Sequence, residues 1–356
     1  MVLPASTSTP TDPLSGHSTE ANYLFCAEQL PLVSRTFAAC IGLLPKPLER
    51  AILLAYLLCR IADTIEDSPT LPVNRKTELL AAFKQSLKDQ KIDCPAVRAA
   101  FTEPANADEI MAADCQRVMA CYQALPESQK AAILPWITEM CEGMADFAQT
   151  YNSSADHSHL QALETEQDLD QYCYYVAGTV GHLLTDLFRQ HQGCLSDSNY
   201  KALKALSTSF GLGLQLTNII KDVADDRQRN WSFVPRQLCE QYGINVENLL
   251  DPTQAQAAQA VMQHLINKAR GHLNDALQYC TQLPRSQYRI RLFCLAPLYF
   301  AIRTLKLAEQ DPDLLNPDHK VKITRKQVSR TLSMTFLVAP VNPLVRAYYH
   351  RLAEDY

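Results

Sequence analysis

Two groups of carboxylates in this chain follow apolar runs and repeat at helical spacing. They are Asp63, Glu66 and Asp67 in the first group, and Asp222 and Asp226 in the second. Residues three or four positions apart share one face of an α-helix, so the members of each group would project together. Carboxylates one turn apart repel by about 3 kcal/mol at an effective dielectric of about 20, and a cation between them would relieve that repulsion. Oxygen ligands suit Mg²⁺, with Mn²⁺ as the alternative ion, completed by water and substrate phosphates. The spacing therefore predicts a diphosphate site.

The competing interpretation of each group is a solvated acidic face at a helix end. Polar residues extend each group backwards along the same stripe, through apolar sequence where unpaired polar groups would be costly to bury. This pattern favours a site. The stripes are Tyr56, Arg60, Asp63 and Asp67 in the first helix, and Gln215, Asn218, Asp222 and Asp226 in the second.

The composition indicates one all-α domain. Of the 356 residues, 47% are hydrophobic, 20% are charged and only ten are glycine, which favours long helices over tight turns. We find no strand alternation. A net charge of −5 without a basic run argues against a nucleic-acid partner. The twelve cysteines include no C-x-x-C pair, so we expect reduced thiols in a cytosolic protein.

The chain divides into a short tail and a helical domain. Residues 1–20 are rich in Ser, Thr and Pro, with neither a basic region nor an apolar core, and predict a flexible N-terminal tail rather than a signal peptide or anchor. Residues 21–356 are expected to form one catalytic domain. No apolar run reaches about 18 residues, so we expect no membrane span.

A third segment, Tyr172 to Gly181, passes from aromatic residues to Ala177, Gly178 and Gly181 in a helical context. Small residues allow another backbone or a ligand to approach closely, and two glycines weaken a helix enough to kink it. The segment predicts either simple helix packing or a helix that opens to form the wall of a pocket.

With these segments in view, the chain resembles the squalene/phytoene synthase family of head-to-head prenyl synthases. Five blocks in order, over about residues 22–330, carry the resemblance. They are Ser34-Arg35-Thr36-Phe37, Tyr56 to Asp67, Tyr172 to Gly181, Gln215 to Asp226, and Phe293-Cys294-Leu295-Ala296-Pro297. Within the family, the stretch from Asp275 to Leu305 and the segment Val321-Lys322-Ile323 look more like squalene synthases, of a bacterial type without a C-terminal anchor.

The chain departs from the family pattern after the second acidic group. Many members have a Gly-Arg pair there, whereas this chain reads Arg229-Asn230-Trp231. Trp231 thus replaces an arginine expected to hold a diphosphate or NADPH. Arg227 and Arg229 are the two candidates to take its place.

The resemblance implies an isoprenoid-synthase-type helical bundle with a central cavity. It implies that two farnesyl diphosphates condense head-to-head through presqualene diphosphate with Mg²⁺, and that NADPH reduces this intermediate to squalene. The alternative is a dehydrosqualene or phytoene synthase-type enzyme without the reductive step. A non-catalytic scaffold relative would be expected to lose its acidic groups, and this chain keeps both. We expect a cytoplasmic monomer, and the apolar product makes peripheral contact with the inner membrane face an expectation as well.

The resemblance also implies roles for individual residues. Asp63, Asp67, Asp222 and Asp226 would hold Mg²⁺. Arg60, Lys221, Ser34, Arg35 and Thr36 would contact phosphate, while Phe37, Tyr56, Glu66 and Gln215 would contact substrate. Tyr172 would lie near the allylic cation, either stabilising it or assisting proton removal, with a diphosphate oxygen as the alternative base. Val176, Ala177, Val180, Leu183, Leu212 and Phe293 would form an apolar wall that excludes water. Asn218 and Lys322 would face NADPH, at a site that is not a Rossmann fold because no G-x-G-x-x-G is present.

Overall fold

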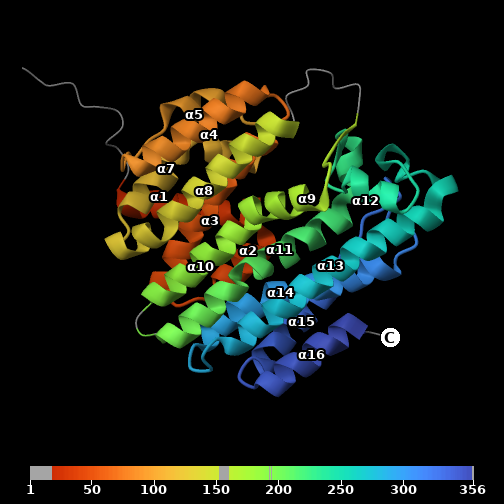
Figure 1. Cartoon of the computed structure of the whole chain (residues 1–356). Helices are drawn as coiled ribbons and strands as arrows, with labels where there is room; N and C mark the ends of the chain where they lie inside the picture. The colour runs from red at the N-terminus through yellow and green to blue at the C-terminus, as the bar shows by residue number, and fades with distance from the viewer. Residues whose placement is uncertain (1–17, 152–159, 192, 194, 355–356) are drawn as a thin grey trace, which may run out of the picture.

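The structure is a computed structural model that describes residues 18–151, 160–191, 193 and 195–354. Helices run through almost all of this part of the chain and pack side by side around a central group that includes α3, α11 and α14 (Figure 1). The predicted all-α class is confirmed. Within the described residues, no helix is both long and apolar enough to cross a bilayer.

Three of the N-terminal helices, α1, α2 and α6, begin at a side-chain cap. The Ser18 hydroxyl accepts a hydrogen bond from the Ala21 amide at 3.2 Å, so α1 begins at Thr19, inside the range predicted as tail. Residues 1–17 of that predicted tail lie outside the described part of the chain. The helices of this half are α1 (Thr19–Val33), α2 (Arg35–Ile41), α3 (Lys46–Asp67), α4 (Val73–Lys88), α5 (Pro95–Ala100), α6 (Ala107–Ala113), α7 (Cys115–Gln123) and α8 (Glu127–Tyr151).

Helix α3 carries the first acidic group because its apolar residues cover more than one face. Thirteen of its residues are buried, from Leu48 to Ile65. A helix that is apolar nearly all round belongs in the interior, so α3 takes its few polar residues with it into the core.

A π-helix, η2 (Tyr174–Gly178), lies between α9 (Glu166–Cys173) and α10 (Thr179–Gln190). Both interpretations of this segment hold. A Cβ added at Gly181 would lie 2.0 Å from the Ser207 carbonyl oxygen, which is helix packing at a distance that only glycine permits. The widened turn also places Val176 and Ala177 on the wall of a cavity.

The longest helix, α11 (Asp197–Gln228), packs against α13 (Ala255–Gln282), α14 (Tyr288–Gln310), α10 and η2. A Cβ at Gly211 in α11 would lie 2.2 Å from the Ala177 carbonyl oxygen. The second acidic group lies in the last turns of this helix.

A parallel pair of two-residue strands joins β1 (Gln161–Ala162) to β2 (Trp231–Ser232). The sequence predicts no strand, because two residues are too short to show alternation, and the structure corrects this with the short pair. The remaining elements are α12 (Arg236–Gln241), the 3₁₀ turns η3 (Val246–Asn248) and η4 (Pro252–Gln254), α15 (Arg325–Val338) and α16 (Asn342–Glu354).

All eleven cysteines of the described residues are free and buried. Burial raises the pKa of Cys141 to about 12, so its thiol stays protonated. The expectation of thiols that behave as small hydrophobic side chains is confirmed for these residues.

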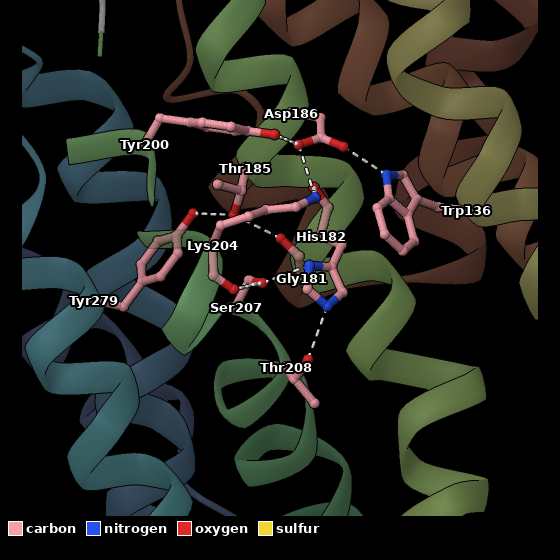
Figure 2. A network of polar contacts seen from close by, with 10 residues as sticks. All are labelled: Trp136, Gly181, His182, Thr185, Asp186, Tyr200, Lys204, Ser207, Thr208 and Tyr279. Atoms are coloured by element: carbon pink, nitrogen blue, oxygen red, sulfur yellow. Dashed lines mark hydrogen bonds and ion pairs between the residues drawn. The ribbon is translucent and has the colours of Figure 1, made fainter. Parts of the chain in front are cut away.

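A polar network fixes α8, α10 and α11 against one another (Figure 2). The Asp186 carboxylate accepts hydrogen bonds from Trp136 Nε1 at 2.7 Å, Tyr200 at 2.8 Å and Lys204 Nζ at 2.8 Å. The two ring nitrogens of His182 contact the hydroxyls of Ser207 at 2.8 Å and Thr208 at 2.9 Å. Because these groups satisfy one another's hydrogen-bonding capacity, the network has a structural role and stabilises the packing of the three helices.

Candidate active site

Two connected hollows lie between α3, η2, α10, α11 and α14. The first, here the apolar cavity, is enclosed by mainly apolar side chains, and the second, here the acidic mouth, is open and polar. Asp67, Tyr172, Gln215 and Asn218 line both hollows, so the two are continuous. The other residues of the acidic mouth are Ile219, Asp222, Asp225, Asp226, Gln228, Arg229, Phe233 and Lys320.

The structure brings the two predicted stripes to the same site. Asp63 and Glu66 line the apolar cavity beside Asp67, while Asp222 and Asp226 line the acidic mouth. Both stripes therefore face connected hollows and do not lie on separate faces of the bundle.

Asp63 and Glu66 are half-buried and Asp67 is exposed, and their charges are not fully compensated. Burial, together with the nearby carboxylates of Asp67 and Asp108, raises the pKa of Asp63 to about 7. Arg60 opposes this effect, with Nη1 at 3.8 Å from the Asp63 carboxylate. Burial, Asp67 and Asp63 likewise hold the pKa of Glu66 well above its usual range.

On α11 each acidic side chain meets a cation. Asp226 is 4% exposed and forms an ion pair with Arg229. Burial raises the pKa of Asp226 to about 6, with Asp222 and Asp67 adding to the effect and Arg229 opposing it. Lys221 forms an ion pair with Asp222. In addition, Lys320 Nζ lies 2.6 Å from the Asp225 carboxylate, which brings the loop after α14 to the mouth.

The carboxylates of the two helices are oxygen donors of the kind that divalent cations take. Carboxylates whose pKa values are raised by burial and by one another gain from a nearby positive charge. Among the described residues, no group of three or more His, Cys, Asp or Glu side chains converges on one point as a complete ligand set. One or two carboxylates per ion, completed by phosphate oxygens and water, is the arrangement that suits Mg²⁺.

Arg229 rather than Arg227 takes the place next to the acidic group. Arg229 lines the mouth and pairs with Asp226. Arg227 instead donates from Nη2 to the Glu247 carbonyl oxygen at 2.9 Å, on the other side of the helix end. Trp231, which stands in the position of the expected family arginine, packs its ring against Phe147 and lines neither hollow.

Tyr172 lies where the apolar cavity meets the acidic mouth. It is 7% exposed, and its ring stacks on Phe233 with centroids 4.6 Å apart. Burial, followed by the charges of Glu66 and Asp67, holds the pKa of Tyr172 well above its usual range. The hydroxyl is therefore protonated at the point where apolar and acidic surroundings meet.

The predicted phosphate-contacting residues are only partly brought to the site. The Ser34 hydroxyl accepts a hydrogen bond from the Phe37 amide at 3.3 Å and caps α2. Ser34, Thr36 and Lys221 line neither hollow, and Thr36 is exposed. The side chain of Arg35 lies outside the described part of the structure.

Arg60, Tyr56 and Phe37 do line the apolar cavity. Arg60 Nη2 donates to the Tyr56 hydroxyl at 3.2 Å, and its Nε lies 3.5 Å from the Asp108 carboxylate. The Phe37 and Tyr56 rings lie 5.5 Å apart. Arg60 is thus held between the aromatic side of the cavity and the acidic group.

Most of the predicted apolar wall lines the cavity. Val176, Ala177, Val180, Leu183 and Phe293 are among its lining residues. Leu212 is buried but lies behind the wall, where a Cβ at Gly178 would meet it at 3.3 Å. Lining residues with no predicted role include Ile41, Ile52, Leu184, Phe188, Phe210, Leu214, Tyr279 and Pro297.

The two predicted cofactor residues differ in their placement. Asn218 lines both hollows, whereas Lys322 is exposed and lines neither. Lys320 lines the mouth in its place, and the sequence analysis missed it. The sequence carries no signal for it, because Lys320 reaches the mouth through the packing of the loop after α14, where its Nζ lies 2.6 Å from the Asp225 carboxylate.

An all-helical bundle that holds an apolar cavity behind an acidic mouth defines an isoprenoid-synthase-type protein. The family model described as squalene/phytoene synthase matches residues 30–327. The chain therefore belongs to the squalene/phytoene synthase family.

Two curated relatives illustrate the similarity. The squalene synthase of Schizosaccharomyces pombe is 32% identical over 299 residues, which is 83% of this chain and 62% of that protein. The squalene synthase of Saccharomyces cerevisiae is 32% identical over 317 residues, 88% of this chain and 68% of that protein. The match thus spans less than two thirds of the fission yeast relative.

Solved structures agree on the fold. A complex of TcSQS with the ligand BPH1237 superposes with a TM-score of 0.78 at 27% identity, covering 94% of this chain and 92% of that one. A dehydrosqualene synthase in complex with a ligand shares the fold, with a TM-score of 0.59 at 18% identity over 91% of this chain and 98% of that one.

Proposed function

We propose that this protein is a squalene synthase, which joins two farnesyl diphosphates head-to-head through presqualene diphosphate and reduces that intermediate with NADPH. The observation that carries the proposal is the continuity of the apolar cavity with the acidic mouth at Asp67, Tyr172, Gln215 and Asn218. A farnesyl chain needs the first hollow and a diphosphate needs the second. The squalene synthases named above, 32% identical to this chain, support the same reaction.

Bound Mg²⁺, held by Asp63, Asp67, Asp222 and Asp226, would neutralise charge on the departing diphosphate. The chain supplies further positive charge at the mouth through Arg229 and Lys320. Negative charge would develop on the leaving group beside these two side chains. They now pair with the carboxylates of Asp226 and Asp225, and a bound cation would free them to contact the diphosphate.

The cavity wall protects the allylic cation that remains. Aromatic and aliphatic side chains such as Phe188 and Phe293 exclude water, which would otherwise capture the cation as an alcohol. Tyr172 presents a ring and a protonated hydroxyl at the junction of the hollows and would stabilise the cation electrostatically. Because that hydroxyl keeps its proton, the departed diphosphate is the better base, and the substrate proton would pass to it.

The reductive step would use the side of the mouth near Asn218 and Lys320. The segment from Lys320 to Lys326 holds four cations, which suits the phosphates of a nicotinamide cofactor. The four are Lys320, Lys322, Arg325 and Lys326.

A dehydrosqualene or phytoene synthase-type enzyme without reduction is the second candidate. Two observations favour it, namely the exposed position of Lys322 and the tryptophan at position 231 in place of the expected arginine. The deciding experiment incubates the purified chain with farnesyl diphosphate and Mg²⁺, with and without NADPH, and identifies the products. Squalene that forms only with NADPH supports the proposal. Dehydrosqualene in both samples supports the second candidate, and recovery of unreacted substrate in both contradicts each of them.

A further inference from the structure

The corner between α15 and α16 exposes four large apolar side chains to solvent. They are Phe336, Leu337, Val341 and Leu344, here called the apolar corner. Leu337 is 68% exposed and Leu344 is 49% exposed. Single exposed apolar residues are ordinary, but four gathered at the end of α15, the start of α16 and the turn between them indicate a contact surface.

The sequence around the apolar corner is strongly basic. Residues 319–353 contain no Asp or Glu, although the whole chain has a net charge of −5. Arg330 lies two turns before Leu337 on the same face of α15, and Arg346 follows Leu344 closely. Both arginines are exposed. The lysines and arginines of the stretch are Lys320, Lys322, Arg325, Lys326, Arg330, Arg346 and Arg351.

A buried arginine holds the corner in place. Arg291 is fully buried and donates from Nε to the Ala339 carbonyl oxygen at 2.8 Å and from Nη2 to Asn342 Oδ1 at 2.6 Å. Its Nη1 donates to the carbonyl oxygens of Leu283 at 2.7 Å and Cys280 at 3.1 Å. These bonds fix the turn between α15 and α16 to the end of α13, so the apolar side chains are presented on a rigid support.

The corner adjoins the helix that closes the apolar cavity. The Tyr288 hydroxyl donates to the Phe336 carbonyl oxygen at 2.8 Å, and Tyr288 is the first residue of α14. Phe293, which lines the cavity, follows little more than one turn later in the same helix. Figure 1 places α15 and α16 together at the edge of the bundle beside α14.

We propose that the apolar corner docks this protein on the surface of a bilayer that contains anionic lipids. Phe336, Leu337, Val341 and Leu344 would enter the boundary between headgroups and acyl chains, and the surrounding arginines would meet the lipid phosphates. A two-fold contact with a second copy would instead bring the same arginines face to face, which disfavours a dimer through this surface. Docking would also place the cavity's α14 side near the membrane that takes up an apolar product. That last point alone rests on the proposed function.

Vesicle flotation of the full chain tests the proposal. Phosphatidylcholine vesicles with added phosphatidylglycerol are compared with phosphatidylcholine alone, at low and high salt. We expect binding to the anionic vesicles that weakens with salt. Phe336→Ser combined with Leu337→Ser is expected to lower the partition coefficient by about tenfold or more. The matched control is Leu24→Ser combined with Leu32→Ser, since these leucines of α1 are 54% and 65% exposed and lie away from the corner.

Charge reversal provides the second arm. Arg330→Glu with Arg346→Glu is expected to reduce binding to anionic vesicles by about tenfold. Lys91→Glu with Lys201→Glu removes the same charge from exposed positions elsewhere and is expected to have a smaller effect. Turnover of farnesyl diphosphate without vesicles and the melting temperature verify that each variant is folded.

Three results would overturn the proposal. The first is no binding of the unaltered chain to any vesicle, and the second is equal binding by the corner variants. The third is a dimer in analytical ultracentrifugation that Phe336→Ser with Leu337→Ser dissociates, because this would make the corner an interface between copies. Since binding is measured without substrate, failure here is distinguishable from failure of the proposed reaction.

Discussion

Asp63 combines burial with neighbouring negative charge, and both raise the pKa of its carboxyl to about 7. The unfolded chain releases this proton near pH 4, so the folded state binds the extra proton between about pH 4 and pH 7. Stability of the metal-free protein therefore falls as pH rises through that window. The ionised Asp63 carboxylate therefore lowers the stability of the folded protein and gives the site its negative charge.

We expect Asp63→Asn to stabilise the metal-free protein at about pH 8 by about 1–3 kcal/mol, and the gain to disappear near pH 4. The same change should lower turnover by about 10²-fold or more. Urea unfolding in EDTA at several pH values measures the stability. Asp89→Asn is the control, because Gln85 and Lys91 hold the pKa of that exposed carboxyl below its usual range, so its removal should not stabilise. A destabilised Asp63→Asn at pH 8 would contradict the assignment.

Arg229 and Arg227 provide a matched pair at the end of α11. Arg229→Gln should lower kcat/KM by about 10- to 100-fold, because the proposed function gives Arg229 a charged hydrogen bond to the diphosphate that glutamine would weaken. Arg227→Gln should leave kcat/KM within about threefold, since Arg227 contacts the Glu247 carbonyl oxygen away from the mouth. Steady-state kinetics with farnesyl diphosphate measures both. Equal losses in the two variants would show that the distinction between them is wrong.

At the scale of elements, one close approach of two backbones sets the position of the cavity wall. Gly211 of α11 approaches the η2 backbone so closely that a Cβ would lie 2.2 Å from the Ala177 carbonyl oxygen. Backbone atoms cannot rotate away as a side chain can. The separation of α11 from η2 is therefore fixed by the absence of one methyl group.

Gly211→Ala should destabilise the protein by about 2 kcal/mol or more and displace Ala177 in the wall. Gly271→Ala in α13 should instead stabilise it by about 0.5–1 kcal/mol, because nothing lies within 4 Å of the added methyl and alanine favours a helix. Denaturant unfolding of the two variants measures the difference in sign. A neutral Gly211→Ala would mean that the two elements separate easily.

At the scale of the whole molecule, a buried cation is one of the groups that join the last two helices to the bundle, beside the hydroxyls of Tyr288, Tyr299 and Tyr349. Arg291 bonds to three carbonyl oxygens and to the Asn342 side chain. Arg291→Met should cost about 3–5 kcal/mol, because these buried acceptors lose their donors. Arg291→Lys should recover little, since a single ammonium cannot reach the same four acceptors. Urea unfolding measures the loss, and hydrogen exchange should show it concentrated in α15 and α16.

The sequence was informative where chemistry repeats at helical spacing. The stripes of α3 and α11 predicted the continuous site, and the residues from Tyr172 to Gly181 predicted its wall. It was uninformative about Lys320 and Tyr279, which reach the site only through tertiary packing. Ser34 illustrates the opposite case, because a hydroxyl suited to phosphate is also suited to capping a helix, and the fold uses it as a cap.

The widened turn at Tyr174–Gly178 has a further geometric effect on the chain that contains it. Each residue of a regular α-helix rotates by about 100°, so positions 172 and 181 would point in opposite directions. Absorbing one residue in the wide turn cancels most of that rotation, and both positions face the same hollow. Deleting one residue from this turn would rotate the Tyr172 side chain out of the apolar cavity, while the helix would remain continuous.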